Sequence, residues 1–248
     1  GEERDRLAAF STSTGELTPW KPVVEGGNIH DMKVHGDRLY IAGQFTTMGG
    51  ADRRNLASLS LATGEVTDWD PRPDQEVEVI EPMGDVIYAG GGFQNIGGQP
   101  RLRIGAVSTI TGEATAWDPG ANHRVRVLAA GEDVLYASGA FSNIGGVQQR
   151  FVAISHDTGE VMDWAPWFSF TVTQILPFAD TVLFSGFNTG LRILEKDASA
   201  EYVSWFPDFN ATVRTFVVAD DLVYFVGDFT TIDGQSRRGL SVLRLPAE

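Results

Sequence analysis

The chain has 248 residues, of which 42% are hydrophobic and 10% aromatic, which is ample for a buried core and argues against disorder. Its net charge of −14 would repel phosphate backbones and anionic membranes, so the composition argues against a nucleic-acid partner. It has no cysteine, which excludes disulfides, thiolate metal sites and a cysteine nucleophile. No apolar run reaches the roughly 18 residues needed for membrane insertion, and the polar residues 1–6 contain no signal peptide.

Tryptophans recur along the chain and divide it into repeats. They lie 49, 48, 47 and 41 residues apart, and each is followed two residues later by a proline. They are Trp20, Trp69, Trp117, Trp164 and Trp205. The first four also follow a Thr-Gly pair that ends five residues earlier. Such a regular spacing is typical of a repeat architecture.

A second set of anchors lies in the middle of the repeats. Four phenylalanines are each followed within five residues by Gly-Gly or Asp-Gly, and then by an arginine. They are Phe45, Phe93, Phe141 and Phe229, with Arg53, Arg101, Arg150 and Arg237. Both sets of anchors therefore keep the same register along the chain.

Each repeat predicts four short strands in chain order. The first ends in an apolar stretch such as 125–130, and a tight turn leads to a second strand such as 134–141. After a loop comes a third strand such as 56–61, and a Thr-Gly-Glu turn gives a fourth that ends at the tryptophan. Alternating apolar residues and glycine-containing turns at this spacing indicate β-hairpins. We find no helix-length stretch with a 3.6-residue period.

Four-stranded units of this length cannot bury both faces alone, and they stack radially into a propeller. We therefore predict an all-β fold, a single β-propeller domain over 1–248 with five blades of four antiparallel strands. The predicted blades are approximately 28–69, 76–117, 124–164, 170–205 and 211–248, with the last closed by 4–20. Residues 1–7 match 50–56, so both ends fall on a third strand, and we expect N- and C-terminal strands to close the ring. A piece of a longer array is the alternative.

The composite motif is Gly-x-Phe-x-x-Ile-Gly-Gly, then Arg, then Leu-Ala, then Thr-Gly-x-x-x-x-Trp-x-Pro. It is carried most clearly by 43–71, 92–119 and 139–166. This motif resembles the delta-sixty repeat of bacterial propeller proteins, and the resemblance covers nearly the whole chain. It implies a β-propeller that is part of a secreted or cell-surface protein, with no activity assigned to the repeat itself. Residues 180–205 depart from the motif, because the Gly-Gly-x-x-Arg loop is missing there.

The repeated residues are expected to serve the scaffold. We expect the tryptophans to pack between blades and the glycines to supply positive-φ positions in turns. The repeated arginines, which include Arg4, are expected to pair with a carbonyl or carboxylate of a neighbouring blade.

Functional residues are expected on the face that carries the long loops. The candidates there are the non-repeated residues Arg72, Asp74, Gln75, Glu76, Asn122, His123, Trp167, Phe168, Phe170 and Asn210. Trp167 and Phe168 have no counterpart in other repeats. They could stack on a sugar ring or contact a protein, or they could fill the space left by the deleted loop.

A second candidate site is the mouth of the central channel. One polar position recurs ten residues before the second-strand tyrosine position: His30, Glu78, Arg126, Thr173 and Arg214. Two residues further on lies an apolar set expected in the core: Met32, Ile80, Leu128, Ile175 and Phe216. A glycosidase needs two or three converging carboxylates. Glu78 is the one carboxylate in this ring, with Asp31 and Glu81 as weak additions, which argues against catalysis.

Metal sites find little support. The histidines lack the spacing of metal ligands. Asp68, Asp70 and Asp74 could hold a calcium ion, but the alternating ligands of an EF-hand loop are absent. We therefore expect no cofactor.

Three functions remain. The favoured one is a non-enzymatic module of a secreted or cell-surface protein that binds a protein or glycan with its long-loop face. The alternatives are an architectural spacer or assembly subunit of a surface structure, and a carbohydrate-active enzyme with a channel-mouth site.

Overall fold

The computed structural model describes residues 2–4, 6–164, 166, 170–186, 190–196 and 207–245. These residues form strands, turns and loops without a helix, so they include no helix long and apolar enough to cross a membrane. The chain divides into two compact units, Gly1–Leu128 and Ala129–Glu248, and the boundary falls within β12 (Val125–Ala130).

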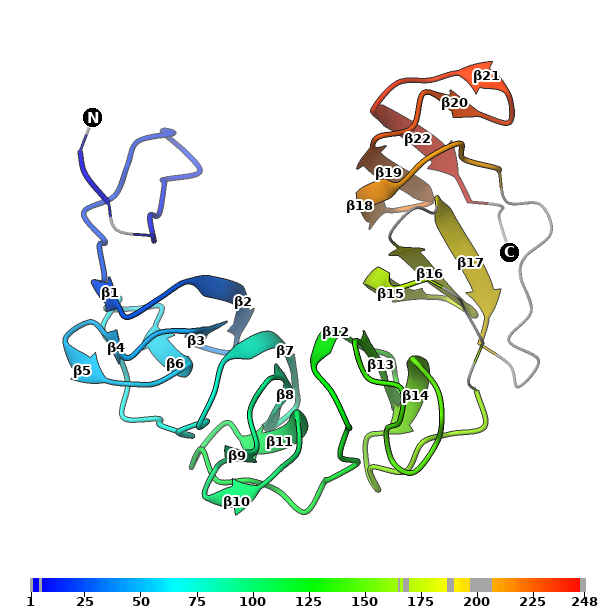
Figure 1. The fold of residues 1–248 in the computed structure, drawn as a ribbon. Coiled ribbons are helices and arrows are strands. Elements are labelled where there is room, and N and C mark those ends of the chain that lie inside the picture. The colour runs from blue at the N-terminus through cyan, green and yellow to red at the C-terminus, as the bar shows by residue number, and fades with distance from the viewer. Residues whose placement is uncertain are drawn as a thin grey trace. The chain divides into compact units, whose positions relative to one another are not determined.

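The first unit contains the first two predicted blades, each built around a three-stranded antiparallel sheet (Figure 1). The strand orders are β2-β3-β6 and β7-β8-β11. The strands are β2 (Ile29–His35), β3 (Arg38–Gly43), β6 (Leu56–Ser60), β7 (Val77–Met83), β8 (Val86–Gly91) and β11 (Ile104–Ser108). β8 and β11 are buried over nearly their whole length, as expected of a sheet covered on both faces, whereas β2 alternates between half-buried and exposed residues.

The second unit repeats this pattern. Its sheets include the orders β15-β16-β17 and β18-β19-β22, and β13 pairs with β14. The strands are β13 (Val134–Gly139), β14 (Phe151–Ser155), β15 (Val172–Phe178), β16 (Thr181–Gly186), β17 (Leu191–Glu195), β18 (Val213–Ala219), β19 (Leu222–Gly227) and β22 (Leu240–Arg244). The predicted first, second and third strands of the repeat are thus confirmed.

Short two-residue strands lie inside the loops between the second and third strands. They are β4 (Thr47–Met48), β5 (Ala51–Asp52), β9 (Asn95–Ile96), β10 (Gln99–Pro100), β20 (Thr231–Ile232) and β21 (Gln235–Ser236). A further short strand, β1 (Val24–Glu25), precedes β2 and pairs with β4. The repeated Gly-Gly pair is the turn between β4 and β5, with φ of 57° at Gly49 and 82° at Gly50. Two consecutive positive φ angles define the hairpin turn that glycine favours, which explains why the sequence repeats this pair.

The fourth strand is shorter than predicted. In the repeats whose fourth strand is described, it is reduced to one bridge to the third strand, for example Leu59 with Val66 and Val107 with Ala114. The amide of Thr67 still donates to the Ser58 carbonyl at 2.9 Å. The chain then leaves the sheet, and proline two residues after the tryptophan has no N–H with which to continue the ladder.

The tryptophans pack between blades, as predicted. Trp69 is buried, and its ring meets Tyr40 of its own blade edge to face, with centroids 5.1 Å apart. Its indole N–H donates to the Ser108 carbonyl of the next blade at 2.8 Å. Trp164 donates likewise to the Glu195 carbonyl at 2.9 Å. Trp205 lies outside the described residues.

Three of the repeated arginines bond within their own blade, where we expected a partner in a neighbouring blade. Arg53 Nη2 donates to the Thr67 carbonyl at 2.9 Å, and Arg4 Nη2 donates to the Thr18 carbonyl at 2.8 Å. Arg101 makes the same bond to Thr115. In these three cases the partner is 14 residues further on, because the arginine precedes the third strand and the bridge segment returns beside it.

Candidate functional site

The predicted channel-mouth residues share a backbone feature that the sequence did not reveal. The register between first and second strands shifts at each of four of them, so each is the extra residue of a β-bulge: His30, Glu78, Thr173 and Arg214. A bulge bends the strand and re-aims one side chain out of the alternating pattern. The polar side chain at this position is therefore turned out of the alternating pattern of its strand.

Three channel-mouth residues meet around one polar hollow of the first unit. The hollow has a volume of about 470 Å³. Its lining is His30, Gln44, Glu76, Glu78, Arg124 and Arg126. Glu76, which we expected on the loop face, therefore belongs to the same site as Glu78, and the site holds two carboxylates rather than one.

Both carboxylates are paired with arginines. Glu78 Oε1 accepts from Arg124 Nη1 at 2.8 Å, and its Oε2 accepts from Arg126 Nε at 3.2 Å. Arg124 Nη1 also forms an ion pair with Glu76. The hydrogen bond to Glu78, helped by the charge of Glu76, raises the pKa of Arg124, although burial opposes this. The side chain of Glu78 is 18% exposed and that of Arg126 50%, so the second arginine faces solvent.

This arrangement suits binding better than hydrolysis. A glycosidase needs one protonated carboxylic acid and one free carboxylate across the scissile bond. Here both carboxylates are engaged by guanidinium groups of the same site. The half-exposed Arg126 can still offer N–H groups to a carboxylate or carbonyl of a ligand.

Asp31 and Glu81 do not line the hollow. Asp31 Oδ2 accepts the amide N–H of Ile80 in the next blade at 3.0 Å, and Glu81 pairs with Lys33 at 3.1 Å. These carboxylates connect β2 to β7. Their expected role as additions to Glu78 is therefore wrong.

Thr173 and Arg214 lie in the second unit. The Thr173 hydroxyl is 3.3 Å from the Ser185 carbonyl, and Arg214 Nε is 2.9 Å from Asp228 Oδ1. Arg214 is thus a solvent-exposed bulge residue with a local acidic partner.

Two of the loop-face candidates, Asp74 and Asn210, each accept two backbone amides of the loop that follows the second strand, and we call such a residue a cap. Because the cap recurs in two blades, their description as non-repeated is corrected. Asp74 Oδ1 accepts the amides of Gln94 and Asn95 at 2.8 and 3.1 Å, and Asn210 Oδ1 accepts those of Thr230 and Thr231. Burial alone would raise the pKa of Asp74, but hydrogen bonds from the Asn95 side chain and the two amides outweigh it and lower the pKa. Each cap lies three residues before the first strand, and Asn122 occupies the same position.

The three aspartates considered for calcium are not brought together. Asp70 Oδ2 accepts from Arg72 Nε at 2.6 Å, and Arg53 lies within ion-pair distance of both Asp68 and Asp70. Asp74 instead accepts the backbone amides of Gln94 and Asn95 in the loop after β8. Within the described ranges, no group of three acidic or histidine side chains is suited to a metal ion.

The remaining loop candidates have separate surroundings. His123 Nδ1 accepts the Arg124 amide at 2.9 Å, beside the polar hollow. Phe170 stacks on Phe184 with ring centroids 6.2 Å apart, so its ring packs against the sheet. Gln75 is exposed next to Asp74. Trp167 and Phe168 lie outside the described residues.

Comparisons with known proteins identify the fold. No protein-family model matches the chain, and no curated protein matches it. The crystal structure of the computationally designed Ika8 protein is similar with a TM-score of 0.59 and 10% identity, over 88% of this chain and 71% of that one. The crystal structure of the RRP9 WD40 repeats has a TM-score of 0.61 and 11% identity, over 88% of this chain and 64% of that one.

The structure of U3-55K is similar to the same degree, with a TM-score of 0.61, 11% identity and coverage of 88% and 65%. The chain therefore spans just under two thirds of the length of these two structures. At such low identity the likeness shows the fold alone. Together with the repeated antiparallel sheets and the absence of helix from the described residues, it shows that the chain has a β-propeller fold.

Proposed function

We propose that this chain is a non-enzymatic interaction module that binds a protein partner at the polar hollow. The observation that carries the proposal is the pairing of both carboxylates with arginines, with Arg126 left half exposed. Bulges in β2 and β7 aim His30 and Glu78 at this place from a rigid sheet. A rigid scaffold that presents charged groups of both signs is suited to recognising a polar segment of a partner.

A protein ligand fits the lining better than a glycan does. Sugar rings are held largely by stacking on aromatic faces, and the six lining residues include no Trp, Tyr or Phe. Arginine side chains next to a fixed acid instead match carboxylate and carbonyl groups of a polypeptide.

The setting of the module is also part of the proposal. The motif carried by 43–71, 92–119 and 139–166 resembles the delta-sixty repeat, which supports a secreted or cell-surface protein and a place in a larger surface assembly. The composition supports a non-nucleic-acid partner, because the net charge is −14.

A peptide-display selection on the whole chain tests the binding role. Arg126→Gln removes the solvent-facing guanidinium of the hollow, and Arg214→Gln removes an exposed arginine at the equivalent sequence position of another blade, so the second variant is a matched control. Peptides enriched on the parent should bind Arg126→Gln about tenfold or more weakly and Arg214→Gln equally well. Peptides that bind all three proteins alike would remove the hollow from the proposal.

An activity screen tests the non-enzymatic part. We expect no turnover of a panel of chromogenic glycosides and esters by the parent. Turnover that disappears in Glu78→Gln would contradict the proposal, because it would show that this carboxylate performs chemistry.

A further inference from the structure

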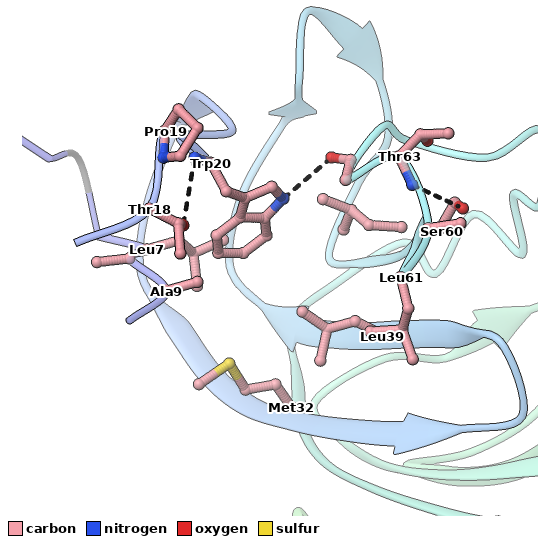
Figure 2. A pocket seen from close by; sticks show the side chains of 14 residues that line it. Leu7, Ala9, Thr18, Pro19, Trp20, Met32, Leu39, Ser60, Leu61 and Thr63 are labelled. Atoms are coloured by element: carbon pink, nitrogen blue, oxygen red, sulfur yellow. Dashed lines mark hydrogen bonds between the residues drawn. The ribbon is translucent and has the colours of Figure 1, made fainter. Parts of the chain in front are cut away.

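The first unit carries hollows of different chemistry. An apolar cavity of about 660 Å³ is surrounded by Trp20, Met32 and Leu39, which Figure 2 shows. Met32 opens onto this cavity and is 53% exposed, so the expectation that it belongs to the core is wrong. The polar hollow, by contrast, is lined by charged and polar side chains and has a second hollow next to it.

The second hollow has a volume of about 310 Å³, and its lining includes Arg54, Asp74 and Gln75. Gln44 and Glu76 line both hollows, so the two share a wall. Arg126 lines only the polar hollow and Arg54 only the second one. The two hollows together therefore form a groove that runs from one arginine to the other across the shared wall, and we call it the polar groove.

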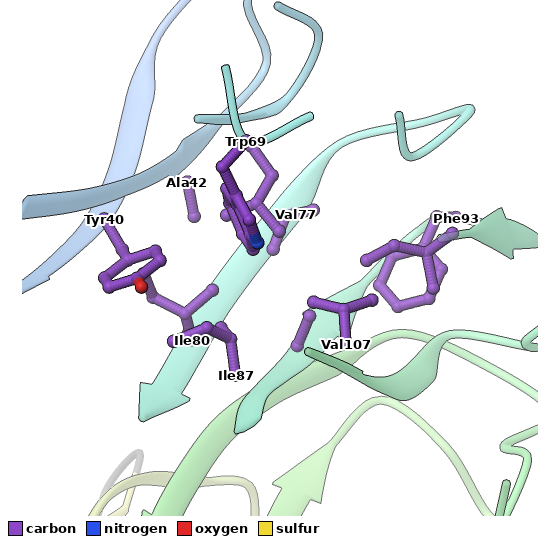
Figure 3. Close-up of a cluster of buried hydrophobic side chains, with 11 residues drawn as sticks. Tyr40, Ala42, Trp69, Val77, Ile80, Ile87, Phe93 and Val107 are labelled. Carbon is purple, nitrogen blue, oxygen red and sulfur yellow. The ribbon is translucent and has the colours of Figure 1, made fainter. Parts of the chain in front are cut away.

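The polar groove lies on a rigid floor. Val77, the residue between the two carboxylates of the polar hollow, is completely buried, and Figure 3 shows it in one cluster with Trp69. Asn55 Nδ2 donates to the Pro73 carbonyl at 3.0 Å, which ties the loop before β6 to the segment before β7. A groove that is formed in advance loses less conformational entropy when it binds a ligand.

The charges of the groove are sorted by depth. The side chains of Glu76 and Glu78 are only 12% and 18% exposed, and both pair with Arg124. The side chains of Arg126 and Arg54 are 50% and 66% exposed. A ligand therefore meets guanidinium groups before it meets these carboxylates, although the chain as a whole has a net charge of −14.

Both exposed arginines keep N–H groups for a ligand. Within the described residues Arg126 and Arg54 each bond only through Nε, which leaves their Nη groups unengaged. The partner of Arg54 is the exposed Asp52 at 3.5 Å, a kind of pair that contributes little. Both oxygens of Asp74, in contrast, accept N–H groups of the loop around Asn95. The groove thus offers more unengaged donors than acceptors, which suits a ligand with carboxylates.

Two glutamines are suited to a polypeptide backbone. Gln44 and Gln75 are exposed, and neither side chain has a hydrogen-bond partner in the described part of the chain. The position of Gln44 is held by Gly92 and Ala140 in the next two blades, so the scaffold needs no long side chain there. A primary amide has both donors and an acceptor, which match the carbonyl and N–H of a peptide unit.

We propose that the polar groove binds an extended acidic segment of a partner polypeptide, with one carboxylate at Arg126, a second at Arg54, and the backbone across Gln44. The inference rests on the proposed interaction function of the polar hollow and names the chemistry of its partner. A guanidinium can bond both oxygens of a carboxylate at once, which gives the pairing its geometry. Attraction by the exposed arginines also directs an acidic segment to this place on an otherwise acidic chain.

Short labelled peptides of serine and threonine, each with two glutamates at a varied spacing, are the probes, and the whole chain is the receptor. The control peptides carry glutamine in place of glutamate. In the receptor, Arg54→Gln removes the cation of the second hollow. Arg238→Gln is its matched control, because Arg238 is exposed and occupies the same repeat position in the last blade.

We expect saturable binding that is strongest at one spacing of the glutamates. Arg54→Gln and Arg126→Gln should each weaken it by about tenfold or more, as should glutamine in the peptide, whereas Arg238→Gln should bind as the parent does. Replacing one glutamate in the Arg54→Gln background should cost less than in the parent, because the two groups act as a pair. Circular dichroism establishes that the variants keep the parent's β-sheet content.

Equal binding of glutamate and glutamine peptides, or no binding of any glutamate peptide to the parent, overturns the proposal. Peptides that lose affinity in Arg126→Gln but bind Arg54→Gln as well as the parent also overturn it, while they leave the polar hollow as a binding site. Binding that neither arginine variant weakens would contradict the proposed function of the hollow as well. A dimer of the chain that is lost in Arg54→Gln overturns the proposal too, since it would show that a second copy occupies the groove.

Discussion

Replacing Trp69 tests whether the repeated tryptophans hold neighbouring blades together. Trp69→Ala removes a buried indole, its edge-to-face contact with Tyr40 and its hydrogen bond to Ser108. Loss of a buried tryptophan side chain costs about 3–5 kcal/mol. Trp69→Phe keeps a ring against Tyr40 and loses the hydrogen bond and part of the packing, so we expect about 1–2 kcal/mol.

Trp20 provides the matched comparison within the same unit. It is half-buried, and its hydrogen bond to the Gly64 carbonyl is 3.2 Å long. No tyrosine lines the apolar cavity that Trp20 shares with Met32 and Leu39. We therefore expect Trp20→Ala to cost about 2 kcal/mol, roughly half the cost at Trp69.

Thermal unfolding followed by circular dichroism measures the difference. For a chain of this length, 1 kcal/mol lowers Tm by about 2–4 °C, so Trp69→Ala should lower Tm by about 6–20 °C and Trp20→Ala by about 4–8 °C. Equal losses for the two variants would refute the reasoning, because they would show that the tyrosine partner and complete burial contribute nothing.

Three further predictions concern the caps, the repeated arginines and a buried tyrosine. Because the pKa of Asp74 is lowered in the folded chain, its stabilising effect is complete above its unfolded value of about 3.8 and is lost as the pH falls through its folded value. As the pH falls from about 5 to 3, the free energy of unfolding measured by urea titration should therefore decrease less for Asp74→Asn than for the parent. An equal decrease for the two proteins would contradict this. Arg53→Met should destabilise by about 2–3 kcal/mol, since it removes a charged donor to the Thr67 carbonyl. Arg237→Met should cost below about 1 kcal/mol in the same urea titration, because Arg237 is exposed and bonds its neighbour Ser236. A larger loss of stability for Arg237→Met than for Arg53→Met would contradict the account. Burial raises the pKa of Tyr136 to about 12, so its contribution to stability should persist through pH 10 and be lost as the pH approaches 12. In Tyr136→Phe, this part of the stability loss between about pH 10 and pH 12, followed by ultraviolet absorbance, should be absent.

The strands and the tryptophans could be predicted because their signals are local and repeated. Period-two alternation places β13 over residues 134–139, within the predicted second strand 134–141, and β6 over 56–60. Trp69 follows the third strand at a fixed distance, so its place between blades follows from the repeat alone. The fourth strand was overestimated at residues such as 66–69, since the sequence does not show that the indole leaves the sheet for the next blade.

The polar contacts could not be predicted, because they depend on register between strands far apart in the sequence. Glu78 meets Arg124 and Arg126 from a bulge that shifts one residue in β7, and a bulge has no sequence signature here. Asp74 and Asn210 differ in charge, which hid their common role as caps. A search for oxygen acceptors three residues before each first strand would have found them.

Hydrogen exchange in the presence of a peptide selected on the parent chain is the most direct test of the proposed binding site. The account predicts added protection of the amides at 76–78 and 124–126 on peptide binding, and no added protection in Arg126→Gln. Protection confined to other segments, or unchanged by that substitution, would contradict the assignment of the polar hollow as the interaction surface.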